Sequence, residues 1–212
     1  MEIIVPLLSI LGAIAIGAAS PGPSFVFVTR AAIALSRRDA LAAALGMGVG
    51  GVVYGGLGLF GLQTMLAQAH WLYLALKVAG GLYLLWLAIQ LWRYAKEPIT
   101  VQPSGVERAP SARRSFTLAA ITQLSNPKAA IVYGSIFAVF LPAHPPLWTF
   151  AVLLPSIFVI EAGWYALVAL VFSSDKPRAA YLRSKHWFDR AAGAVMGALG
   201  LRLIVGVGSA QA

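Results

Sequence analysis

Two ionisable residues lie deep within apolar stretches of this chain and are its strongest candidates for chemistry. Glu161 is near the middle of one stretch, and Lys128 is close to the middle of another. A charge at the centre of a bilayer costs roughly 2.5–3.5 kcal/mol even on lenient insertion scales. Either the two form a structural ion pair, or Glu161 binds an ammonium group or a proton while Lys128 attracts a carboxylate. Ionisable groups inside membranes are usually functional, which favours the second interpretation.

Two proline-containing motifs interrupt apolar stretches at corresponding places, Ser20-Pro21-Gly22-Pro23 and Asn126-Pro127. Proline has no N–H donor, so a helix must kink or break there. Broken backbone is tolerated in a bilayer only where protein or water satisfies it, and both breaks should therefore face the interior. Helix N-termini exposed at a break can hold a carboxylate. A single break would favour a packing kink, whereas two corresponding breaks favour a substrate site.

Neutral polar side chains could complete such a site. Gln123 and Asn126 could bond a substrate or a neighbouring helix, and the role of Tyr165 is equally open. The predicted substrate-binding and coupling residues are Glu161, Lys128, Asn126, Pro127, Ser20, Pro21, Gly22, Pro23, Gln123 and Tyr165. The sequence contains no cysteine and no metalloprotease or nucleophile motif, so an enzyme is not expected.

Composition shows which elements must position these residues. The chain has 59% hydrophobic and only 11% charged residues, whereas a soluble domain has about a quarter charged. A membrane-spanning helix needs about 20 apolar residues. The sequence therefore predicts an all-α membrane protein with six transmembrane helices, at about residues 3–30, 40–63, 71–92, 116–141, 147–173 and 190–208.

The basic residues predict an orientation. Lys and Arg cluster after the first, third and fifth predicted helices, and the connections around residues 68–70 and 142–146 contain neither. Because cytoplasmic loops are enriched in Lys and Arg, both termini are expected on the periplasmic side. The net charge of +9 is thus explained by loops, without a nucleic-acid partner.

The six helices divide into two halves. Residues 1–95 and 116–212 are predicted as three-helix repeats, joined by a proline-containing cytoplasmic linker at 96–115. Three matches recur in order, namely Ser20-Pro21 with Asn126-Pro127, Tyr54 with Tyr165, and Lys77-Val78-Ala79-Gly80 with Arg190-Ala191-Ala192-Gly193. Repeats with an odd number of spans must be inverted in the membrane, which predicts alternating access around a midplane site.

The second predicted helix carries a glycine-rich segment, Gly46-Met47-Gly48-Val49-Gly50-Gly51. It matches a dinucleotide-binding pattern, but it lies within an apolar helix with no preceding strand, so that match is rejected. The small residues at spacings of four instead predict close helix packing. The packing could be within the protomer or between protomers, as in a homo-oligomer.

Taken in order, these motifs identify a family. Ser20-Pro21-Gly22-Pro23, the Arg37-Arg38 loop before the glycine-rich helix, residues 76–84, Asn126-Pro127-Lys128 and Ala192-Gly193 together resemble the LysE/RhtB family of amino-acid exporters. The resemblance implies amino-acid efflux across the bacterial inner membrane, driven by the proton gradient and without an organic cofactor. It does not fix the amino acid. Many relatives have Asp where this chain has Glu161.

A rival interpretation is an ion transporter or channel on the same helical frame, with Glu161 as a cation ligand. A lone central carboxylate argues against tight binding of a divalent cation, because such sites need several oxygen or imidazole ligands.

Overall fold

The structure is a computed structural model that describes residues 3–68, 70–97, 111–142 and 145–208. Within these residues the chain forms helices and no strand, as predicted: α1 (Ile4–Ala19), α2 (Pro23–Ala34), α3 (Arg37–Gln68), α4 (His70–Arg93), α5 (Ala112–Leu124), α6 (Pro127–Phe140), α7 (Trp148–Phe172) and α8 (Asp175–Gly208). Most of the predicted linker lies outside the described residues. Helix α5 begins inside its last part, at Ala112.

The first apolar stretch is a broken helix. Helices α1 and α2 are bent by 55° at the break. Gly22 is extended before the first residue of α2, Pro23, which needs no hydrogen-bond acceptor at that position. The predicted break is therefore confirmed.

The fourth apolar stretch is also broken, between α5 and α6. The Asn126 side-chain oxygen accepts from the backbone N–H of Lys128 at 3.0 Å, which caps α6, and Pro127 is the first residue of that helix. By their positions at the helix starts, Gly22-Pro23 corresponds to Asn126-Pro127. This register differs by two residues from the predicted one, because it is Pro23 rather than Pro21 that opens the second helix.

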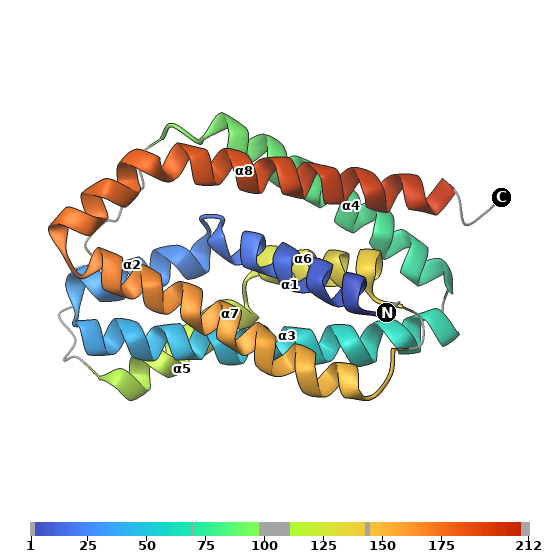
Figure 1. Ribbon diagram of the computed structural model, residues 1–212, viewed down its shortest axis with the longest axis horizontal. Coiled ribbons are helices and arrows are strands. Elements are labelled where there is room, and N and C mark those ends of the chain that lie inside the picture. Colours follow the sequence, from blue (N-terminus) through green and yellow to red (C-terminus); the bar gives the residue numbers. More distant parts are fainter. Residues whose placement is uncertain (1–2, 69, 98–110, 143–144, 209–212) are drawn as a thin grey trace.

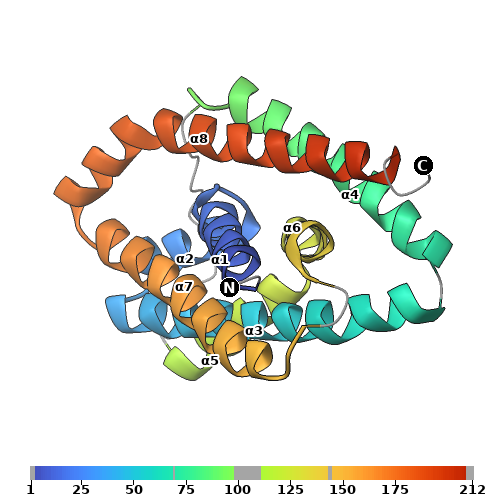
Figure 2. The same cartoon turned by 45° about the vertical axis from the view of Figure 1, so that its right-hand side comes forward.

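Four long helices surround α1 and α6 (Figures 1 and 2). Helix α3 packs along α7 and α4 packs along α8, and smaller contacts between α3 and α4 and between α7 and α8 close a ring. Helices α1 and α6 lie inside this ring and contact each other (Figure 2). Helix α5 packs along α3, and α2 contacts both α5 and α7. The two breaks are thus held at the centre.

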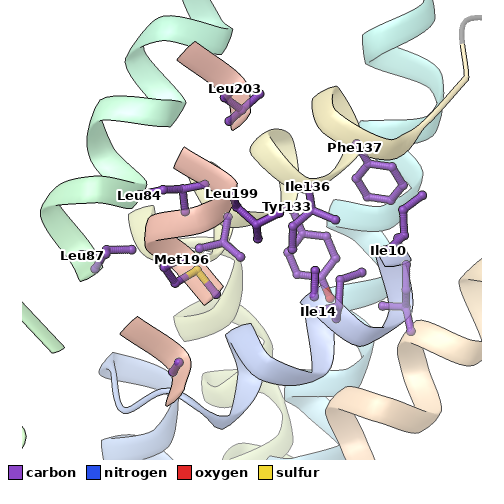
Figure 3. Packing of buried hydrophobic residues seen from close by; sticks show 14 of the residues in the cluster. Ile10, Ile14, Leu84, Leu87, Tyr133, Ile136, Phe137, Met196, Leu199 and Leu203 are labelled. Carbon is purple, nitrogen blue, oxygen red and sulfur yellow. The ribbon is translucent and has the colours of Figure 1, made fainter. Parts of the chain in front are cut away.

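Buried apolar side chains join the ring to the broken helices (Figure 3). Leu84 of α4 and Met196 of α8 belong to the same cluster as Ile136 of α6 and Ile14 of α1, and all four are almost inaccessible to solvent. Lipid tails are as apolar as these side chains, so close packing rather than water exclusion holds such helices together in a bilayer.

The glycines of α3 provide another close contact. A side chain at Gly50 would place its Cβ 2.6 Å from Gln123 Cγ, and one at Gly51 would place it 2.8 Å from Glu161 Cγ. Gly46 similarly lies against the backbone of α5. This face of α3 is filled within the protomer, and so it is not free to form the homo-oligomer contact that the spacing suggested.

The outer surfaces suit a lipid environment. Large apolar side chains such as Leu57, Phe60 and Val159 are exposed, where a soluble protein would place polar groups. Among the described residues, α3 (over residues 37–61) and α7 are long and apolar enough to cross a membrane, and α1 with α2 would make a third, bent span. The chain is thus a helical membrane protein, and the full set of six spans stays a prediction.

Helix α8 differs most from its prediction. It begins at Asp175 rather than near residue 190, because the stretch before Asp189 is helical although rich in charge. The charged part of α8 before Asp189 is not an apolar run, so hydrophobicity alone does not predict a helix there.

Candidate functional site

Lys128 ties the two breaks together. Its ammonium group donates to the carbonyl oxygen of Ser20 at 2.7 Å and to the Ser20 hydroxyl, and more weakly to the carbonyls of Gly17 and Pro21 at 3.4 Å. The Gly17 carbonyl already accepts from the backbone N–H of Ser20 at 3.3 Å, whereas the carbonyls of Ser20 and Pro21 lie in the break between α1 and α2, beyond the last turn of α1. A cation also suits the negative end of a helix dipole. The ammonium group therefore bonds the opposite break, and not the carboxyl of Glu161.

A second tie runs between the breaks through neutral side chains. The Asn126 amide donates to the hydroxyl of Ser24 at 3.0 Å, and that hydroxyl donates to Gln123 Oε1 at 2.5 Å. All three side chains are buried. The N-terminal turn of α2 is thus bonded to the C-terminal turn of α5 and to the cap of α6.

Glu161 of α7 receives only neutral donors. Its Oε1 accepts from the Tyr133 hydroxyl at 2.9 Å, and its Oε2 accepts from the Gln123 amide at a long 3.4 Å. The side chain is 2% exposed. Burying a carboxylate without a bonded cation is costly, and the cost is offset when the carboxyl binds a proton or an ammonium group.

A small cavity lies between these groups. Its polar lining comes from Gln123, Asn126, Lys128, Tyr133, Glu161 and Tyr165, and its apolar lining includes Ile14 and Val132. Five of the predicted site residues are therefore gathered around one space. The volume is about 20 Å³. One water molecule needs roughly 10–15 Å³, so a water fits and an amino acid does not. The site is closed in this conformation.

The remaining predicted residues shape the backbone. Pro23 and Pro127 are exposed and set the helix starts rather than lining the cavity. A Cβ at Gly22 would lie 3.2 Å from Lys128 Cδ, so the glycine leaves room for the lysine stem. Ser20 is buried and accepts from the ammonium group of Lys128.

Two tyrosines outside the predicted set of site residues also contribute to the site. Tyr133 was not among the predicted residues, although its position within an apolar stretch was a usable signal. Tyr54 stacks on it with ring centroids 5.7 Å apart and donates to the carbonyl of Leu124 at 2.7 Å. That carbonyl ends α5, so Tyr54 satisfies the second break much as Lys128 satisfies the first.

A third ionisable residue, Asp189 of α8, was also missed. It is buried, forms an ion pair with Lys185 at 2.5 Å and interacts electrostatically with Lys128. Its Oδ1 atom has no hydrogen-bond partner among the described residues. Its burial could not be predicted from the sequence, because Asp189 lies just before the last predicted apolar run. No group of three or more His, Asp or Glu in the described part of the chain is placed to hold a metal ion.

Comparison with known proteins gives consistent matches. The profile of the LysE type translocators matches residues 15–206. The threonine efflux protein of Escherichia coli (strain K12) is 36% identical over 188 residues, which cover 88% of this chain and 91% of that protein. The homoserine/homoserine lactone efflux protein of Salmonella typhimurium is 29% identical over 143 residues, or 67% and 68% of the two chains. No solved structure matches.

Proposed function

Because the chain belongs to the LysE family of translocators, we propose that it exports small zwitterionic amino acids from the bacterial cytoplasm across the inner membrane. Two relatives are named for the efflux of threonine and of homoserine, and both compounds carry an ammonium, a carboxylate and a hydroxyl group. The observation that carries the proposal is the cavity at the two breaks, which is lined by an acidic side chain, Glu161, and a basic side chain, Lys128.

The three groups of such a substrate find complementary partners. Glu161 would bind the ammonium group in place of its weak bond to Gln123. The carboxylate would approach Lys128 and the N-terminus of α6, where ammonium and backbone N–H groups both favour an anion. Ser24, with its short bond to Gln123, would exchange bonds with the hydroxyl.

Opening is needed before a substrate can enter. A cavity of about 20 Å³ is too small for threonine, so a wider conformation would have to form during transport. Substrate binding would draw Lys128 away from the carbonyls of Ser20 and Gly17 and release one tie between the halves. The halves, residues 1–95 and 116–212 as inverted repeats, would then rock about the site to give alternating access. The pairing of α3 with α7 and of α4 with α8 supports this, since each pair joins counterpart helices.

The carboxyl group of Glu161 would also couple export to proton entry. When the site faces the cytoplasm, the substrate ammonium would displace a proton from Glu161 into the cytoplasm. When the site faces the periplasm, the substrate would leave and a proton would bind. The protonated carboxyl then returns inward, and each exported molecule is exchanged for one proton.

Efflux from vesicles tests this proposal. Vesicles loaded with a mixture of amino acids and dipeptides, with a proton gradient imposed, should lose small amino acids selectively. In Glu161→Gln, gradient-driven efflux should fall at least tenfold, because the substituted amide binds neither a proton nor an ammonium group as a carboxylate does. The matched control is Glu97→Gln, at an exposed position beyond the end of α4. Unchanged efflux from Glu161→Gln would remove this residue from the mechanism.

A further inference from the structure

A second, larger pocket lies where the C-terminal end of α4 meets the charged part of α8. It has a volume of about 430 Å³ and is lined by Ala95, Lys96, Glu97, Leu182, Arg183, Lys185 and His186. The two helices are bonded at this point, since the Lys185 ammonium group donates to the carbonyl of Tyr94 at 3.3 Å. The pocket thus belongs to the α4–α8 pair, two helices that lie side by side in Figure 1.

The charge of the pocket is positive. Lys185 is neutralised by Asp189, whereas Lys96 and Arg183 are exposed and, within the described residues, have no ion-pair partner. Glu97 is the single acidic residue of the lining. The lining therefore offers two unneutralised cations, with the imidazole of His186 beside them, to an anion.

Exposed aromatic residues near the pocket indicate its position across the membrane. Trp92 and Tyr94 of the α4 end and Trp187 and Phe188 of α8 are large aromatic side chains that are exposed. Exposed Trp and Tyr mark the boundary between hydrocarbon and headgroups. Helix α8 has 34 residues, or about 51 Å at 1.5 Å each, against a hydrocarbon core of about 30 Å. Its charged first part must therefore extend into the headgroup layer, on the side where Lys and Arg accumulate.

We propose that this pocket binds the phosphate headgroup of an anionic phospholipid of the inner leaflet, such as phosphatidylglycerol. Lys96 and Arg183 contact the phosphodiester oxygens, and the half-exposed Leu182 lies against the start of an acyl chain. Basic pockets between transmembrane helices on the cytoplasmic side suit such headgroups. A lipid is favoured over free phosphate because the exposed aromatic residues Tyr94 and Trp187 are next in sequence to residues of the lining, and because Glu97 disfavours a doubly charged anion.

Native mass spectrometry of the full chain in detergent tests the assignment. The probes are phosphatidylglycerol, phosphatidylcholine with the same acyl chains, and inorganic phosphate. We expect phosphatidylglycerol to bind at least tenfold more tightly than phosphatidylcholine. The double variant Lys96→Gln with Arg183→Gln should lose roughly tenfold or more of the affinity for phosphatidylglycerol. Each single variant should lose a smaller share, which keeps the test decisive if the double variant folds poorly.

The matched control is Arg37→Gln with Arg38→Gln, which removes the same charge from exposed positions at the start of α3. It should leave the affinity unchanged. Equal losses in both double variants would mean diffuse attraction and would overturn the site. So would equal binding of the two lipids, or displacement of phosphatidylglycerol by inorganic phosphate. Because no transport is measured, the outcome is independent of the export proposal.

Discussion

Lys128 shows how a partly buried cation can be held without a carboxylate partner. Its depth in an apolar stretch was readable from the sequence, and so was that of Glu161. Its partners were not readable, because the carbonyls of Ser20 and Pro21 become available as acceptors only where the chain breaks in the other half. Residue type and depth therefore identify candidates, and their bonds need the three-dimensional structure.

Removing the donors of Lys128 should destabilise the protein. In Lys128→Met the carbonyl and hydroxyl of the buried Ser20 lose this donor, at a cost of about 1–3 kcal/mol. We expect a lower thermal-unfolding midpoint in detergent and no efflux. Lys128→Arg keeps the charge and the donors and should recover most of the stability. The control Arg30→Met changes an exposed residue of α2, and an equal loss there would contradict the argument.

Exchanging the two charges tests whether they form a plain ion pair. In the double variant Glu161→Lys with Lys128→Glu, the carboxylate at position 128 cannot donate to the Ser20 carbonyl. We therefore expect that this double variant lacks the bond between the two breaks and shows no efflux from loaded vesicles. If the double variant transported as well as the parent, a structural pair would be the correct interpretation.

The Tyr133 hydroxyl should matter for function more than for folding. Tyr133→Phe removes the 2.9 Å bond to Glu161 but keeps the ring that stacks on Tyr54. Hydrogen bonds to charged groups contribute about 1.5–3 kcal/mol, so efflux should fall roughly tenfold or more. The unfolding midpoint should fall less than in Lys128→Met, because Glu161 keeps its bond from Gln123 and can bind a proton, which offsets the lost donor. Tyr83→Phe, at a half-buried ring on α4, is the control and should transport normally.

At the scale of elements, apolar runs and prolines predicted most of the helices and both breaks. Each predicted run corresponds to one long helix or to a broken pair, and both breaks follow from Pro23 and Pro127. The start of α8 was missed because the residues before Asp189 are rich in charge and do not form an apolar run. The ring of α3, α4, α7 and α8 was also beyond prediction, since it depends on contacts between distant segments.

The glycines of α3 allow a test at this scale. In Gly51→Ala the new Cβ would lie 2.8 Å from Glu161 Cγ and 2.9 Å from the Tyr133 hydroxyl oxygen, so either α3 or these two side chains must shift. We expect a lower unfolding midpoint and reduced efflux. At Gly56 a Cβ meets nothing within 4 Å, and Gly56→Ala should be neutral or stabilising by up to about 1 kcal/mol. If both variants behaved alike, the close packing of this face would be refuted.

At the scale of the whole molecule, export requires one fixed orientation, and the two ends of α7 can report it. Leu147, before α7, is 87% exposed, and Ser174, after it, is also exposed. The natural chain contains no cysteine, so Leu147→Cys and Ser174→Cys each introduce a single thiol. From the distribution of Lys and Arg we predict that Leu147 faces the periplasm. A membrane-impermeant maleimide should label Leu147→Cys in spheroplasts, and Ser174→Cys only after permeabilisation. The cysteine-free parent controls for background, and the opposite pattern would invert the orientation and with it the direction of proposed transport.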